Sequence, residues 1–243
     1  MISLLRKELR SFLSSIIGYL VIVVFLLINS LFLWLFDGDF NLLNAGYAGM
    51  DSLFVLAPWV FMFLIPAITM RMFSDEKKGG TMELLLTRPL TDTQIILAKF
   101  IAGFILVLFA LIPTLVYFYS IYQLGAPVGN MDIGGTIGSY IGLLLLGGSY
   151  VAIGLFASSI TDNQIVAFIV ALFISFFLFM GIDSLTSFSW LGSAEYAVKQ
   201  IGITAHYNSL SRGVIDSRDV VYFGSLMALF IGMTRVVIQS RKW

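Results

Sequence analysis

Cysteine is absent from this chain of 243 residues, and histidine occurs once. Without cysteine the chain can form neither disulfides nor thiolate metal sites, although this does not identify its compartment. A single histidine also excludes paired-histidine haem ligation. Charge is scarce: Asp, Glu, Lys and Arg make up 12% of the residues, against about 25% in ordinary soluble domains. The formal net charge is zero, so the composition does not favour nucleic-acid binding.

Hydrophobic residues, by contrast, make up 59% of the chain. Several apolar runs each supply the ~20 residues that a helix needs to cross the hydrocarbon core of a membrane. No polar stretch is long enough for a separate soluble domain. We therefore predict an all-α polytopic membrane protein, a single transmembrane domain over residues 1–243, with six spans at about 16–36, 51–73, 93–122, 137–160, 165–182 and 220–238.

Residues 2–13, ISLLRKELRSFL, place apolar and basic side chains on different helical faces. We expect an interfacial helix on an anionic leaflet; the alternative is that the basic residues are no more than a flank that orients the first span. The apolar run that follows is too long for a signal peptide, so we expect the first span to be retained. The apolar face comprises Ile2, Leu5, Leu9, Phe12 and Leu13, and the basic residues are Arg6, Lys7 and Arg10.

Local patterns mark the third and fourth spans. Thr91 and Gln94 have the spacing of a capping box at the start of the third span, and Asp92 lies where the helix dipole favours an anion. Gly138 and Gly142 in the fourth span are spaced as a close-packing pair. That pair is either a packing site or the ordinary glycine enrichment of membrane helices.

The distribution of positive charge predicts the orientation. Six spans place both termini on one side of the membrane, together with residues 74–92. All but three of the 14 Lys and Arg residues lie on that side, the exceptions being Lys199, Arg212 and Arg218. Because Lys and Arg concentrate in cytoplasmic loops, we expect the termini and residues 74–92 in the cytoplasm and residues 183–217 outside.

The segment between the second and third spans, SDEKKGGTMELLLTRPLTDTQIILAK, is rich in charge. Charged side chains cost roughly 2.5–3.5 kcal/mol each at the centre of a membrane helix, so this segment must lie outside the hydrocarbon. Gly79 and Gly80 interrupt the helix that leaves the second span, and Thr81 can cap a short helix that ends before Pro89. In that helix Glu83 and Arg88 suit the dipole, and Met82, Leu85 and Leu86 form an apolar face.

This segment is either a connector that rests on the headgroups or a helix presented to a cytoplasmic protein. A second polar break, Thr161, Asp162, Asn163 and Gln164, joins the fourth and fifth spans. It is equally well explained as a tight turn or as a smaller second contact with such a partner.

Residues 183–217 are too apolar for a solvated loop. We expect short helices that dip back into the outer leaflet, where protein must cover their backbone. We expect His206 to make a hydrogen bond there rather than serve a metal or acid–base site. The apolar and aromatic residues of this segment are Trp190, Tyr196, Ile201, Ile203, Tyr207, Leu210 and Val214.

Ionisable residues fall near the ends of the expected spans, whereas proton- or sodium-coupled transporters usually carry carboxylates inside the membrane. The energy source is therefore expected to be external. An intramembrane Ser/His protease is disfavoured, because the single histidine lies in the outer segment. No Gly-Lys dipeptide occurs, so the chain has no phosphate-binding loop of its own.

Three runs in order along the chain resemble ABC-2 type transporter permeases. The first is the charged segment, which shares a Glu…Gly-Thr-x-Glu-Leu-Leu…Pro pattern followed by a lysine in the third span. The second is residues 154–170, and the third is residues 206–223. The matching positions are Glu76, Gly80, Thr81, Glu83, Leu84, Leu85, Pro89 and Lys99 in the first run, and Ser158, Ser159, Asn163, Gln164 and Ala167 in the second.

The resemblance implies the ABC-2 permease fold, similar to type V exporters, in the cytoplasmic (inner) membrane. It implies two copies of an ABC ATPase as partners, together with a sister permease or a second copy of this chain. No cofactor would bind here, because ATP and Mg²⁺ would bind the ATPase. Residues 74–92 would be the coupling segment that docks on the ATPase, through Glu76, Gly80, Thr81, Glu83, Leu85, Leu86, Arg88 and Pro89.

Further implications concern the outer side and the biological role. Trp190, Tyr207 and Leu210 would belong to a hydrophobic lid over the permease dimer interface. The N-terminus most resembles the gliding-motility permeases of Bacteroidetes. An ATP-driven energiser or assembly scaffold, which moves no solute itself, is therefore the alternative to export. The substrate is not predicted.

Overall fold

The computed structural model describes residues 1–82, 90–186 and 195–240, and these ranges contain helices and no strand. The helices are α1 (Ile2–Leu13), α2 (Ile16–Ser30, continued by a π-helical turn, Leu31–Leu35), α3 (Asp51–Thr69), α4 (Arg71–Lys78), α6 (Asp92–Leu111), α7 (Leu115–Leu124), α8 (Ile133–Ile160), α9 (Gln164–Phe176, continued by a π-helical turn, Phe177–Gly181), α10 (Ile182–Thr186), α11 (Glu195–Lys199), α12 (Ile203–Leu210) and α13 (Ser217–Ser240).

Six helical stretches in the described residues are long and apolar enough to cross a membrane, which confirms the predicted all-α, six-span architecture. Several run beyond the expected spans. The fourth starts at Ile133, because the Asp132 carboxylate accepts a hydrogen bond from the Gly135 amide at 2.8 Å and caps the helix before its glycines. The six stretches are Gly18–Leu35, Asp51–Lys78, Asp92–Leu124, Ile133–Ile160, Gln164–Thr186 and Ser217–Ser240.

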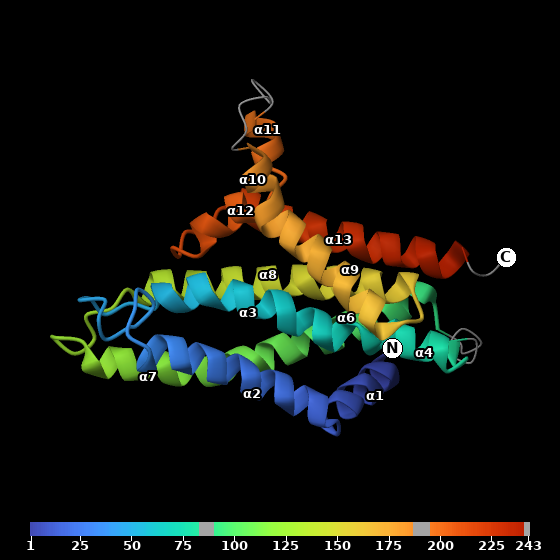
Figure 1. Cartoon of the computed structure of the whole chain (residues 1–243), viewed down its shortest axis with the longest axis horizontal. Coiled ribbons are helices and arrows are strands. Elements are labelled where there is room, and N and C mark those ends of the chain that lie inside the picture. The colour runs from blue at the N-terminus through green and yellow to red at the C-terminus, as the bar shows by residue number, and fades with distance from the viewer. Residues whose placement is uncertain (83–89, 187–194, 241–243) are drawn as a thin grey trace.

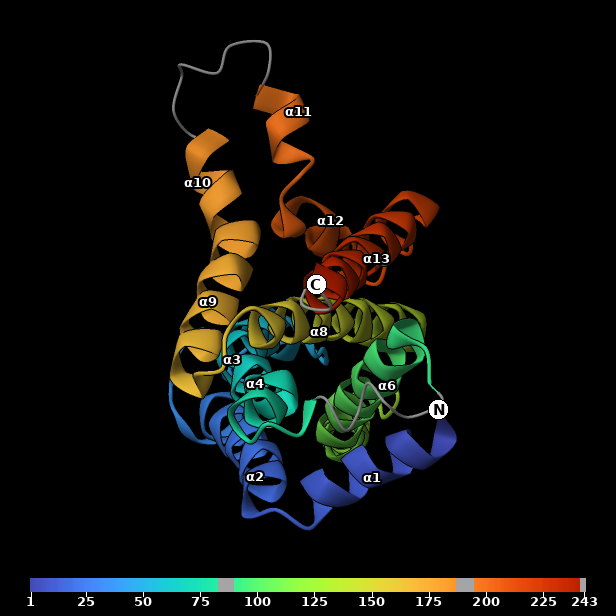
Figure 2. The ribbon, with the colours of Figure 1, turned by 90° about the vertical axis from the view of Figure 1, so that its right-hand side faces the viewer.

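Helix α8 is the centre of the bundle. In its most apolar stretch 83% of the residues are buried, whereas 28% or fewer are buried in the spans of α2, α9 and α13. It contacts α3, α6, α9 and α13, and Figure 2 shows these helices arranged around it. The outer helices therefore present apolar side chains to the surroundings, as expected of a protein whose solvent is lipid.

Glycines allow α8 to approach its neighbours closely. A Cβ atom on Gly138 would lie 2.4 Å from the Gly213 carbonyl oxygen, and one on Gly142 would lie 2.6 Å from the Leu210 Cβ. Farther along, a Cβ on Gly154 would overlap Thr69 of α3. The predicted close-packing pair is thus confirmed, because a side chain at either position would separate α8 from the end of α12 or from the turn that follows it.

The segment between α9 and α13 combines a projecting part and a packed part. α10 and α11 extend away from the bundle (Figure 1), whereas α12 packs on α8. Within α12, Tyr207 and Leu210 are buried, and the Tyr207 hydroxyl donates a hydrogen bond to the Phe54 carbonyl at 2.7 Å. These two residues therefore lie in the protein interior, and Trp190 lies outside the described residues.

His206 makes hydrogen bonds through both ring nitrogens, as expected. Its Nδ1 lies 2.7 Å from the Asp219 carboxylate, and its Nε2 lies 2.9 Å from the Gln200 carbonyl oxygen. Its ring stacks on Tyr222 at 3.9 Å between centroids. These contacts attach α12 and the end of α11 to the beginning of α13.

Replacing Gly138 with alanine tests the packing of α8. The Gly213 backbone cannot move aside as a flexible side chain could, so we expect G138A to lose about 1–3 kcal/mol of stability. Alanine at Gly224, where nothing lies within 4 Å of the added Cβ, is the matched control and should leave stability unchanged or slightly higher. Thermal unfolding of both variants in detergent measures the difference. Equal melting temperatures would contradict the packing.

Candidate functional site at the charged end of the bundle

The charged end is the end of the bundle where α1, the C-terminus of α4, the N-terminus of α6 and the α8–α9 junction lie together. Figure 2 looks along the bundle from this end and shows α1 running across the lower right of the view, beside α2 and below α6. The far end is the opposite one, which contains residues 36–50, residues 125–132 and α12.

Helix α4 carries the second span into the charged segment and ends where predicted. Gly79 terminates it, and Gly80 has a φ of 64°, a left-handed conformation that glycine adopts without steric cost. The Thr81 hydroxyl donates a hydrogen bond back to the Glu76 carbonyl at 3.3 Å. The other predicted docking residues, Glu83, Leu85, Leu86, Arg88 and Pro89, lie outside the described residues.

After this gap, α6 begins with the predicted capping box. The Thr91 hydroxyl accepts a hydrogen bond from the Gln94 amide at 3.3 Å, and the Gln94 side chain accepts one from the Thr91 amide at 3.2 Å. Two backbone amides at the helix end are thereby satisfied. The start of α6 is therefore determined locally, by Thr91 and Gln94, which belong to the C-terminal part of the charged segment.

Lys99 lies about two turns into α6 and is 1% exposed. Its Nζ lies 3.2 Å from Glu8 Oε1 and 3.0 Å from Glu76 Oε1, and it donates a hydrogen bond to the Met72 carbonyl at 2.6 Å. A buried ammonium is tolerated only when opposite charge and hydrogen-bond acceptors surround it. Lys99 therefore connects α6 to α1 through Glu8 and to α4 through Glu76 and Met72.

Helix α1, the predicted interfacial helix, contacts this cluster through a face that the sequence pattern did not single out. Leu4 and Glu8 are buried, although sequence analysis assigned them to neither the apolar nor the basic face, and Ile2 stays exposed. Lys7, beside Glu8, lies 3.4 Å from Glu76 Oε1 and strengthens the connection to α4. Lys99 was counted only as a basic residue of the cytoplasmic side and as a match to the family's lysine, with no partner assigned, whereas the structure buries it. One available signal was that Glu8 is the single acidic residue of α1.

The α8–α9 junction is attached to α4 by hydrogen bonds. The Ser158 hydroxyl accepts from the Phe73 amide at 2.9 Å and the Ser74 amide at 3.1 Å, and donates to the Met70 carbonyl at 2.9 Å. These bonds satisfy backbone groups at the bend between α3 and α4. A displacement of α4 would therefore pull on α8 through the hydrogen bonds of Ser158.

The polar turn makes contacts within the chain. The Gln164 side-chain amide donates to the Asp75 carboxylate. The Asn163 side chain caps α9 by accepting from the Ile165 amide at 2.9 Å, and the Thr161 hydroxyl accepts from the Asn163 amide at 3.1 Å. Asp162 and Asn163 are exposed. These bonds suit a tight turn, and contact with a partner through the same residues stays a prediction.

A cavity of about 200 Å³ opens beside the Lys99 cluster, between α1 and α4. Three cations (Lys7, Arg71 and Lys99) and three carboxylates (Glu8, Asp75 and Glu76) line it, so its formal charges balance. Glu76 Oε2 is buried and has no hydrogen-bond partner among the described residues. An unsatisfied buried acceptor costs free energy. Because Glu76 lines the cavity, a further hydrogen-bond donor there could satisfy it.

A comparison with protein families identifies the group to which this architecture belongs. The model of the ABC-2 family transporter protein matches residues 2–239, nearly the whole chain. The chain belongs to the ABC-2 transporter family. It is a multi-pass membrane protein, and the family is a transmembrane component that associates with an ABC ATPase. A search among curated proteins finds no match.

Replacing Lys99 with methionine tests the cluster of this ABC-2 transporter chain. The side chain keeps its approximate volume, but Glu8 and Glu76 lose the cation that compensates their burial, so we expect a loss of about 3–5 kcal/mol. Unfolding in mixed micelles measures it. K78M, an exposed lysine on the same segment, is the matched control and should behave as the wild type.

A second variant separates lost charge balance from lost packing. The triple variant E8Q/E76Q/K99M removes all three charges, and it should recover most of the stability that K99M loses. If K99M is as stable as K78M, or if the triple variant is no better than K99M, the buried ion pairs do not hold the three helices together.

Proposed function

We propose that this chain is the transmembrane subunit of an ATP-driven exporter and that residues 74–92 dock on its ABC ATPase. The observation that carries the proposal is the buried Lys99, which joins α1, α4 and α6 directly beside the docking segment. In this proposal the charged end, with both termini, faces the cytoplasm of the cell and the protein spans the inner membrane. ATP and Mg²⁺ bind the ATPase, since this chain has no phosphate-binding loop.

The contacts support a route from the docking segment to the spans. Closure of the ATPase displaces residues 74–92, and α4, which ends at Lys78 inside this segment, moves with them. Glu76 and Met72 transmit this displacement to Lys99, and Lys99 transmits it to Glu8. The Ser158 bonds carry it to α8, the central helix. Buried ion pairs suit this role because they are either formed or broken, so a small displacement switches the helices between distinct arrangements.

The assembly proposed here contains two ATPase subunits and two permease subunits, the second being a sister permease or another copy of this chain. The similarity of the N-terminus to gliding-motility permeases favours a motility system as the setting. For the same reason an ATP-driven energiser or scaffold that moves no solute is the second candidate. The catalytic step belongs to the ATPase in both cases.

The docking segment is tested by coupling. The chain is co-purified with its partner ABC ATPase and reconstituted in proteoliposomes, and ATPase activity is measured with and without the permease. We expect Glu83→Ala and Leu85→Ala to lower co-purification and the ATPase stimulation by about tenfold or more, the loss of one good contact. Both variants should still insert, because neither position lies in a described span.

The control for this experiment is Arg218→Ala, which removes a charge at the start of α13, outside the docking segment. It should leave stimulation unchanged. Full stimulation by both the Glu83 and Leu85 variants would contradict the assignment of the docking segment. Transport by the reconstituted complex, compared with the phenotype of a gene deletion, separates an exporter from an energiser: a deletion phenotype without any transported solute favours the energiser.

A further inference from the structure

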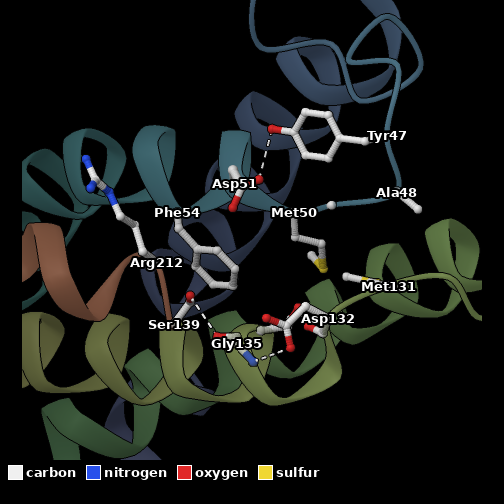
Figure 3. A pocket seen from close by; sticks show the side chains of 12 residues that line it. Tyr47, Ala48, Met50, Asp51, Phe54, Met131, Asp132, Gly135, Ser139 and Arg212 are labelled. Carbon is white, nitrogen blue, oxygen red and sulfur yellow. Dashed lines mark hydrogen bonds between the residues drawn. The ribbon is translucent and has the colours of Figure 1, made fainter. Parts of the chain in front are cut away.

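A second cluster of charges surrounds a pocket at the far end of the bundle. The pocket has a volume of about 230 Å³ and lies between the N-terminus of α3, the N-terminus of α8 and the turn after α12. Figure 3 shows Arg212 at one side and Tyr47 at the other, with Asp51 above and Asp132 below. None of these residues takes part in the coupling route.

The wall that carries Arg212 is held rigidly. Gly213 has a φ of 81°, and a Cβ there would lie 2.2 Å from the Gly135 Cα, so the turn lies directly on the backbone of α8. The Ser139 hydroxyl donates a hydrogen bond to the Ser211 carbonyl at 3.0 Å and fixes the preceding residue. The backbone of this wall is therefore fixed without a ligand, which lowers the entropic cost of binding.

The carboxylates are oriented but retain acceptor capacity. Asp51 Oδ2 accepts a hydrogen bond from the Tyr47 hydroxyl at 2.9 Å, a bond that raises the pKa of Tyr47. Asp132 Oδ1 accepts from the Gly135 amide at 2.8 Å. Each of these bonds uses one oxygen of an ionised carboxylate, which has about four acceptor sites. Capacity for an incoming donor therefore remains at both residues.

The charged side chains around the pocket, Asp51, Asp132 and Arg212, are exposed and are not paired with one another. Among the ion pairs of the described residues, none includes Asp51, Asp132 or Arg212. They nevertheless line one cavity. A ligand that carries both a cation and an anion would contact all three, whereas a simple ion would satisfy only one sign.

An adjoining cavity extends the pocket with different chemistry. It has a volume of about 480 Å³ and shares Tyr47 and Ala48 with the charged pocket. Its side chains are mostly apolar, among them Leu42, Leu43, Ile121 and Leu124. Side by side, the two cavities offer a charged compartment and one that leucine and isoleucine side chains line together with polar backbone groups. That combination matches an amphiphile better than a soluble zwitterion.

We propose that the far-end pocket binds a phospholipid with a primary-amine headgroup: its ammonium donates to Asp51 and Asp132, its phosphate accepts from Arg212, and an acyl chain enters the adjoining cavity. Charge-assisted hydrogen bonds of this kind are the stronger ones in proteins. A primary ammonium has three donors, whereas the trimethylammonium of a choline headgroup has none. The pocket should therefore distinguish the two headgroups.

The test measures binding of short-chain phosphatidylethanolamine to the purified full-length chain in detergent, by native mass spectrometry. Phosphatidylcholine of the same chain length tests the amine, and glycerophosphoethanolamine, which lacks acyl chains, separates a lipid from a free zwitterion. We expect phosphatidylethanolamine to bind about tenfold more tightly than phosphatidylcholine, as for one hydrogen bond to a charged group. Glycerophosphoethanolamine should bind far more weakly than either lipid.

Conservative variants keep the fold and remove only the charge. D51N still accepts from Tyr47, and D132N still caps α8, since asparagine is a good N-cap. Each should reduce the preference for the amine headgroup by about threefold or more, and R212Q should weaken binding of both lipids. The matched control is D39N, an exposed aspartate of the same far-end loop that does not line the pocket, and it should change nothing.

Three results would overturn the proposal: equal affinity for the two lipids, an unchanged preference in both D51N and D132N, or glycerophosphoethanolamine binding as tightly as the lipid. Melting temperatures of the variants, measured alongside, show that each is folded. The measurement needs no ATPase. Its failure therefore leaves the proposed coupling function untouched, and failure of the coupling experiments leaves this site untouched.

Discussion

The cation of Lys99 is the constraint on which the charged end of the bundle depends. It is almost fully buried, and its only described charge partners are two carboxylates from helices that lie far from it in sequence. Removing the cation would leave both carboxylates largely buried without the charge that compensates them. The position of α1 across the bundle and the position of α4 beside α6 are therefore linked to one side chain.

The remainder of the bundle depends on close approach rather than on charge. Lipid gives little hydrophobic driving force between helices, so association relies on van der Waals contact and hydrogen bonds. Helix α8 meets these needs along its length, through Gly138 and Gly142 towards the far end and Ser158 at the charged end. The same helix thereby contacts both the proposed coupling route and the wall of the far-end pocket, at sites separated by most of its length.

Features that depend on neighbouring residues were predictable from the sequence. The six apolar stretches, the capping box of Thr91 and Gln94 and the break at Gly79–Gly80 all follow from length, hydropathy or backbone preference within a few residues. The contact between Glu8 and Lys99 joins residues 91 positions apart, and no periodicity relates them. Both were visible as charges, but a sequence does not show which charges meet.

The sequence by itself determined the class of the protein, because apolar length and the scarcity of charge leave membrane-spanning helices as the stable solution. It also located the charged segment outside the hydrocarbon. Only the tertiary structure decided which charges are buried together at one end and which surround an open pocket at the other. The reason is physical: the free energy of a charge depends on its burial and its partners, and both are set by helices brought together from distant parts of the chain.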